Sequence, residues 1–142
     1  MDDEAPEVLE GDQVTDLVLN TSPDQLLQSL VALVNEGRVP ALPINLWTGG
    51  QVISGELVSA ARYLDETARL LEQVDSVDEI GGIARVHREL ALAAQVWSSG
   101  DELPLYIHLL NVTSRHATGG PTTTCWRGRL SRVDGWSLAL PE

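Results

Sequence analysis

The spacing of apolar residues changes three times along this chain, and that change limits its possible folds more than any other feature. Over residues 22–37 apolar side chains recur every three or four positions, which predicts an amphipathic helix. They alternate with polar ones over 42–57, return to helical spacing over 59–98, and alternate again over 105–140. The predicted order is a helix, two strands, two helices and three strands, which indicates an α+β protein.

Capping and turn residues support this division. Ser22 is the predicted N-cap of the first helix, and Gly37 is its predicted left-handed stop. Gly49-Gly50 predicts a two-residue hairpin turn between the first two strands. Gly55 lies in the middle of the second strand, where a glycine is costly unless the strand bends or another backbone comes close. We therefore expect a strongly curved sheet.

A helix followed by short, glycine-bent strands is typical of the Sm-like small barrel. Residues 46–57 resemble the first Sm hairpin, and residues 126–130 resemble the second Sm signature loosely. We predict an N-terminal helix and a small, strongly bent five-stranded antiparallel sheet or barrel, with a two-helix insertion between strands two and three. An open α+β sheet covered by the helices is the alternative. The predicted organisation is an acidic mobile tail over 1–16 and one α+β domain over 17–142.

The charge balance is strongly acidic, with 9 basic residues, all arginines, against 21 acidic ones and a net charge of −12. A field of this sign repels phosphate backbones and anionic lipids, so nucleic acid is disfavoured as a partner. No apolar run approaches the roughly 20 residues that a membrane-spanning helix needs, and the first residues are acidic where a signal peptide is basic. The single cysteine excludes an intramolecular disulfide. These features predict a cytoplasmic protein.

Residues that carry chemistry do not form a recognisable catalytic or metal-binding motif. His87, His108 and His116 lack ligand spacing, so the sequence predicts no metal site. Cys125 follows the alternation of a strand, which favours a small apolar residue over a nucleophile beside a neighbouring histidine. The adjacent carboxylates Asp65 and Glu66 point apart on a helix. No glycine pair is followed by the lysine of a phosphate loop, and we predict no catalytic residue and no cofactor.

The candidate interaction surface combines aromatic and basic residues. Aromatic side chains are enriched where the binding energy of protein interfaces concentrates. Arginines flanked by tryptophans also fit single-stranded nucleic acid, through phosphate contacts and base stacking. An equally good explanation is that these arginines form ion pairs with acidic neighbours, or with the acidic tail of another copy. The candidate residues are Trp47, Tyr106, Arg127, Arg129 and Trp136.

Three blocks near the end of the chain resemble the gas-vesicle accessory protein U family (GvpU). Residues 106–111 read Tyr-Ile-His-Leu-Leu-Asn, residues 126–130 Trp-Arg-Gly-Arg-Leu, and residues 133–138 Val-Asp-Gly-Trp-Ser-Leu. The segment from Gly49 to Ala60 is also similar, so the resemblance covers roughly residues 22–140. The acidic tail and the absence of lysine depart from the family.

The resemblance implies a non-enzymatic protein that acts in the assembly or clustering of gas vesicles in the cytoplasm. Its implied partners are the vesicle wall protein or other accessory proteins, and further copies of itself. Sm-like barrels commonly associate through their edge strands, which also favours a homo-oligomer. The alternative function is that of an Sm-like single-stranded nucleic-acid-binding protein.

Overall fold

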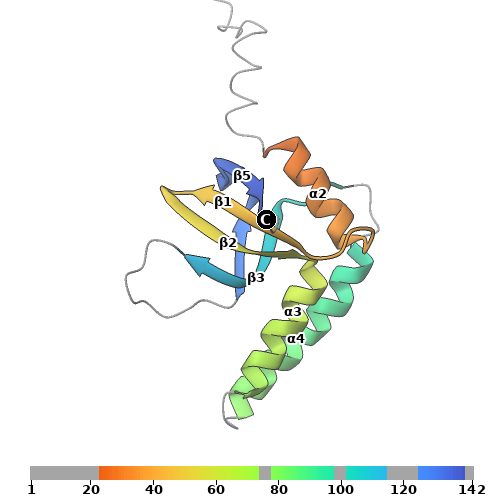
Figure 1. Ribbon diagram of the computed structural model, residues 1–142. Coiled ribbons are helices and arrows are strands. Elements are labelled where there is room, and N and C mark those ends of the chain that lie inside the picture. The colour runs from red at the N-terminus through yellow and green to blue at the C-terminus, as the bar shows by residue number, and fades with distance from the viewer. Residues whose placement is uncertain (1–22, 74–77, 98–101, 115–124, 140–142) are drawn as a thin grey trace, which may run out of the picture.

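The computed structural model describes residues 23–73, 78–97, 102–114 and 125–139, and its elements follow the predicted order (Figure 1). The α+β prediction is confirmed. The predicted tail over 1–16, the cap at Ser22 and the loop around Gly119-Gly120 lie outside the described residues. The helices are α2 (Gln25–Asn35), α3 (Ala60–Gln73) and α4 (Asp78–Trp97), and the strands are β1 (Leu42–Thr48), β2 (Gln51–Val58), β3 (Tyr106–Ser114), β4 (Cys125–Arg129) and β5 (Gly135–Leu138), with a short 3-10 helix over Leu130–Arg132.

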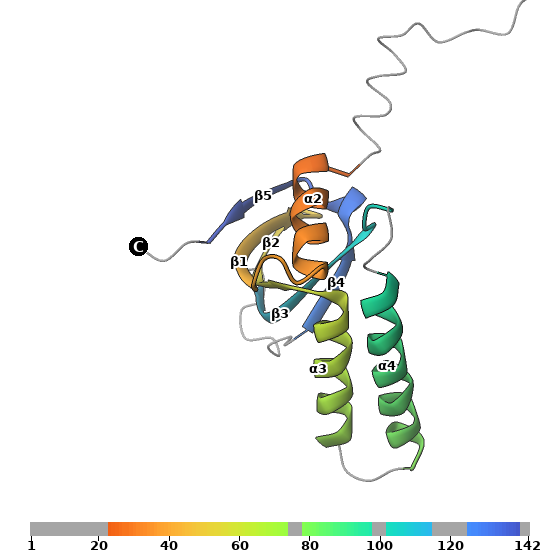
Figure 2. The same ribbon diagram turned by 90° about the vertical axis from the view of Figure 1, so that its right-hand side faces the viewer.

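The five strands form one antiparallel sheet in the order β4-β3-β2-β1-β5. The sheet is curved but not closed, because within the described ranges β4 pairs only with β3, and β5 only with β1 (Figure 2). The Sm-like barrel is therefore not observed, and the open sheet covered by helices is closer to the structure. Gly55 indicates that the sheet bends, but barrel closure needs its two edge strands to pair, and these strands have only five and four residues.

Helix α2 covers the inner, concave face of the sheet (Figure 2). The buried side chains of α2 recur every three or four residues, and they pack against the inward-facing residues of β1, β2 and β3, which recur every second residue. The predicted helical and strand patterns thus contribute to one core. Burial of each large apolar side chain contributes about 1.5–3 kcal/mol. The fully buried members of this core are Leu27, Val31, Ile44, Leu46, Leu57, Ile107, Leu109 and Leu130.

The bend in the sheet comes from a bulge between β2 and β3. Gly55 faces two residues of β3, Asn111 and Val112, and Asn111 has a positive φ of 53°. A Cβ atom added to Gly55 would lie 2.9 Å from the carbonyl oxygen of Leu110. A side chain at this position would thus collide with backbone, which confirms the prediction that Gly55 allows close approach and curvature.

The local turn predictions are confirmed, but the predicted start of the first helix is wrong. Gly49 and Gly50 have φ angles of 55° and 75°, as a type I′ hairpin turn requires. Gly37 ends α2 with a φ of 74°. The N-cap is Asp24, whose Oδ1 accepts a hydrogen bond from the backbone N–H of Leu27 at 3.0 Å. The Asp24 carboxylate caps the helix and also complements the positive end of its dipole.

Helices α3 and α4 form a hairpin that projects from one end of the sheet (Figure 2). Its buried side chains are mostly alanines, which let the two helix backbones approach closely. The helical spacing over 59–98 predicts one apolar stripe that joins Ile83 and Leu90 to the alanines of this helix. The alanines are buried, but Ile83 and Leu90 are 48% and 39% exposed. Glu72 and Arg88 link the helices through a surface ion pair at 2.7 Å. The buried alanines are Ala61, Ala68, Ala84, Ala91 and Ala94.

Candidate functional site

The structure brings three of the five candidate residues together on β3 and β4. Tyr106 faces Arg129 across the two strands, and Arg127 lies two positions from Arg129 on the same face. The Arg127 guanidinium carbon lies 3.7 Å from the centre of the Tyr106 ring. A hydrogen bond with Arg129, and then the charges of both arginines, lower the pKa of the Tyr106 hydroxyl. Tyr106, Arg127 and Arg129 therefore form a positively charged group that favours the binding of an anion.

The other two candidates lie apart from this group. Trp47 on β1 is 43% exposed and faces Gly135 of β5. Trp136 faces Leu46 and packs partly buried against the core, so it lies on the opposite face of the sheet from Trp47. Its indole N–H donates to Asp24 at 3.4 Å. The five residues do not form one continuous surface.

A buried histidine stands directly beside the basic group. His108 is only 6% exposed, and its Nε2 accepts a hydrogen bond from Arg127 Nε at 3.1 Å. Burial, and then the charge of Arg127, lower the pKa of His108 to about 4. The imidazole is thus neutral at pH 7. The ring of Tyr63 lies against it, with ring centroids 4.8 Å apart.

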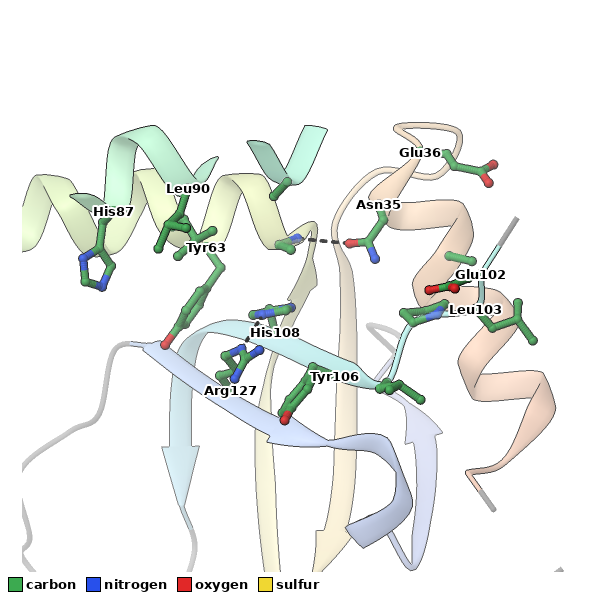
Figure 3. A pocket seen from close by; sticks show the side chains of 16 residues that line it. Asn35, Glu36, Tyr63, His87, Leu90, Glu102, Leu103, Tyr106, His108 and Arg127 are labelled. Carbon is green, nitrogen blue, oxygen red and sulfur yellow. Dashed lines mark hydrogen bonds between the residues drawn. The ribbon is translucent and has the colours of Figure 1, made fainter. Parts of the chain in front are cut away.

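These side chains line one end of a pocket of about 770 Å³ between α2, the α3–α4 hairpin and the sheet (Figure 3). Leucine side chains from α3, from α4 and from the segment before β3 form much of its apolar wall. Glu36 and Glu102 lie at the opposite end, beside α2 (Figure 3). The pocket therefore has a basic, aromatic end and an acidic end. Its leucines are Leu64, Leu90, Leu103 and Leu105.

The contact between His108 and Arg127 is the feature that sequence reasoning missed. The sequence indicated that both residues lie in alternating strands, but not which residue of β4 faces His108. That pairing joins residues 19 positions apart and depends on the register of β3 and β4. The signal would have been the register of the two predicted strands, because the register decides which residue of β4 lies opposite His108.

The structure assigns ordinary structural contacts to several residues that were considered for chemistry. Cys125 faces Leu110 across the strands, not a histidine, and is partly exposed rather than buried. Glu66 pairs with Arg69 one turn further along α3. His87 Nδ1 lies 2.9 Å from the carbonyl oxygen of Ile83 on its own helix. His116 lies outside the described residues.

No group of three or more His, Cys, Asp or Glu side chains in the described ranges is placed to hold a metal ion. No described helix combines the length and the apolar character needed to cross a membrane.

Comparison with known proteins identifies a family. The family model described as gas vesicle protein GvpU-like matches residues 24–140, which is most of the chain. Neither the curated proteins nor the solved structures contain a match. The matched range includes every described strand and helix, and with it the pocket and the basic group. The resemblance seen in the sequence is thereby confirmed, and this chain belongs to the GvpU-like gas vesicle protein family.

Proposed function

We propose that this protein is a non-enzymatic accessory protein of gas vesicles, acting in their assembly or clustering through protein–protein contacts. The observation that carries the proposal is the family match over residues 24–140. The family consists of gas vesicle accessory proteins and is not a known enzyme family. The proposed partners are the vesicle wall protein or other accessory proteins, and the proposed place of action is the vesicle surface in the cytoplasm.

Self-association is part of this proposal, and the open sheet supports it. In the described residues, β4 and β5 each have one side without a strand partner. Unpaired strand edges are templates for pairing with another chain. If β4 of one copy pairs with β5 of the next, the contact is heterologous and generates a ring or a filament. We therefore propose a homo-oligomer built through these two edges.

The proposed contacts with vesicle proteins are made at two separate places, exposed Trp47 on β1 and the basic group of Tyr106, Arg127 and Arg129 on β3 and β4. An exposed tryptophan on a strand is a large apolar anchor, and such residues often dominate interface energies. Trp136 is better placed to support the core than to bind a partner, because its ring packs against buried side chains. The acidic residues before α2 are proposed to keep assemblies soluble by like-charge repulsion.

The test is a clustering assay on isolated gas vesicles, followed by light scattering and electron microscopy. Full-length protein is expected to cluster the vesicles, and Trp47→Ser is expected to weaken clustering severalfold. Val86→Ser, which changes an apolar side chain on α4 that is 52% exposed, is the matched control and is expected to leave clustering intact. Unchanged clustering with Trp47→Ser refutes the proposed surface. Deletion of residues 1–20 with unchanged salt dependence of clustering refutes the role of the acidic segment.

Single-stranded nucleic acid remains the alternative partner, and Tyr106 with two arginines is the feature that favours it. The net charge of −12 opposes it. Fluorescence anisotropy with labelled single-stranded RNA separates the two functions. We expect no binding at physiological salt, whereas salt-dependent binding that Arg129→Gln weakens would favour the alternative.

A further inference from the structure

We propose that the α3–α4 hairpin pairs with the hairpin of a second copy of this chain, through the apolar face of each hairpin. The pairing is two-fold, because the same surface serves both copies. It uses neither the edge strands β4 and β5, nor Trp47, nor the basic group on β3 and β4. It rests on the distribution of side chains over the hairpin, on the charge of the hairpin and on its size.

The apolar face of the hairpin continues the wall of the pocket outward along both helices. On α4, Leu90 lines the pocket, and Ile83 lies two turns before it on the same face. These two side chains are 39% and 48% exposed. On α3, Leu64 lines the pocket, and Leu71 follows it two turns later and is half-buried. The two helices therefore leave large apolar side chains uncovered on the same side of the hairpin.

The opposite face of the hairpin is charged. On α4, Arg85, Arg88 and Glu89 follow helical spacing on this face, and all three are exposed. Arg88 forms its ion pair with Glu72 of α3 there. A hairpin surrounded by water would be polar on both sides, so this division indicates one side for solvent and one side for packing.

The hairpin is also a place where two copies of this acidic chain repel each other little. The whole chain has a net charge of −12, but residues 60–73 and 82–94 carry four arginines and four acidic residues. Like-charge repulsion between two hairpins is therefore weak. A basic or acidic partner would need a charged face for attraction, whereas a second copy needs only matching apolar surface.

The size of the apolar face suits a weak dimer. Helices α3 and α4 have 14 and 20 residues, so the face is about 20–30 Å long, and two adjacent helices make it about 20 Å wide. Two copies thus bury roughly 1,000 Å² in total, which is close to the lower limit for a specific interface. Leu103 and Leu105, which line the adjoining pocket and are 51% and 64% exposed, offer further apolar contact. Val86 lies at the margin of the face, toward Glu89, where single contacts contribute little.

Such a dimer has two ends that can each contact a vesicle, a consequence that rests on the proposed function. Strand β2 runs from the turn beside Trp47 to the start of α3, so Trp47 and the hairpin lie at opposite ends of this strand. The hairpin projects away from the sheet beyond the end of β2 (Figure 1). Clustering requires contact with two vesicles at once, and a dimer joined at its hairpins provides two copies of Trp47 far from the joint.

Analytical ultracentrifugation of the full-length protein, without vesicles and over a wide range of concentrations, tests the pairing. The wild type is expected to associate reversibly. Ile83→Gln/Leu90→Gln is expected to weaken the association at least about tenfold, because two central apolar contacts are lost without a change in charge. Leu92→Gln is the matched control, because Leu92 is 66% exposed and lies on the charged face of the same helix. It is expected to associate like the wild type.

Circular dichroism checks that the variants fold, which is expected because all three side chains are exposed. A double variant that associates like the wild type, or an equal loss in Leu92→Gln, overturns the proposal. A wild type that stays monomeric also overturns it, and would mean that a different protein covers the apolar face.

Flotation with isolated vesicles separates failure of the pairing from failure of the proposed function. The double variant is expected to rise with the vesicles like the wild type, but to cluster them severalfold less. A monomeric double variant that clusters vesicles like the wild type refutes the bridging role of the dimer. Absence of both proteins from the floating layer contradicts the proposed function, whereas the pairing is still decided by ultracentrifugation.

Discussion

His108 should make the stability of this protein fall between pH 6.5 and about pH 4. The structure lowers its pKa from 6.5 to about 4, chiefly because the ring is buried. Above pH 6.5 the imidazole is neutral in both the folded and the unfolded chain, so its protonation does not change the free energy of unfolding. Between the two pKa values the unfolded chain binds a proton that the folded chain does not, and the free energy of unfolding falls. A difference of roughly 2.5 units corresponds to about 3 kcal/mol at full effect.

The assay is urea denaturation, followed by tryptophan fluorescence, at several pH values from 7.5 to 4 and constant ionic strength. His108→Gln is the comparison, because glutamine cannot titrate and its amide oxygen can still accept from Arg127. Asp24, Glu66 and Glu72, whose pKa values are lowered by their hydrogen bonds, lose stability with acid in both proteins. The difference between the two proteins therefore isolates His108.

The wild type is expected to lose about 3 kcal/mol more than His108→Gln over this pH range. A difference that stays constant, within about 0.5 kcal/mol, from pH 7.5 to pH 4 would show that folding does not lower the pKa of His108. Such a result would mean that the His108 ring is exposed to water in solution. Direct titration of the His108 ring by NMR provides an independent value of its pKa.

Substitutions at four further positions should change stability as follows, and chemical denaturation measures each effect. Gly55→Ala should destabilise by about 1–3 kcal/mol, because its methyl group would lie 2.9 Å from the Leu110 carbonyl oxygen. Gly82→Ala in α4, where a Cβ meets no atom within 4 Å, should be neutral or stabilise by up to about 1 kcal/mol. Equal losses of stability in Gly55→Ala and Gly82→Ala would contradict the close approach of backbone at Gly55. Asp24→Ala should cost about 1 kcal/mol through loss of the α2 cap, and Asp24→Asn clearly less. Leu109→Ala, at a fully buried position, should cost about 2–5 kcal/mol, and a loss below 1 kcal/mol would argue against the core.

The order of the elements and the local turns were predictable because they depend on neighbouring residues. Gly37, Gly49 and Gly50 all adopt the positive φ angles that were predicted for them. The spacing of apolar residues correctly separated the strands from the helices. These features depend on backbone preferences within a few residues, so one sequence is enough to show them.

Closure of the sheet and the packing of α4 were not predictable, because each depends on distant parts of the chain. A mid-strand glycine indicates curvature, but whether β4 meets β5 depends on the whole sheet. The apolar pattern of α4 predicted a single stripe with both alanines and larger side chains, and the structure buries Ala84 and Ala91 while Ile83 and Leu90 stay exposed. Close packing of two helices favours small side chains, which a hydrophobicity pattern alone does not reveal.

The candidate site was predictable in part. The sequence identified Tyr106, Arg127 and Arg129, and the register of β3 and β4 brings them together. Trp47 and Trp136 lie elsewhere because they belong to β1 and β5, and they point to opposite faces of the sheet, since Trp136 pairs with Leu46, the neighbour of Trp47 along β1. The pocket itself needed the position of the α3–α4 hairpin relative to the sheet, which no local pattern specifies.

Flotation of isolated gas vesicles in a centrifugal field tests the central claim most directly. Vesicles rise, so a protein that binds their surface rises with them and separates from free protein. Purified full-length protein is expected in the floating layer, in a saturable amount. Recovery of all the protein below that layer, over a range of salt and protein concentrations, would contradict a role at the vesicle surface.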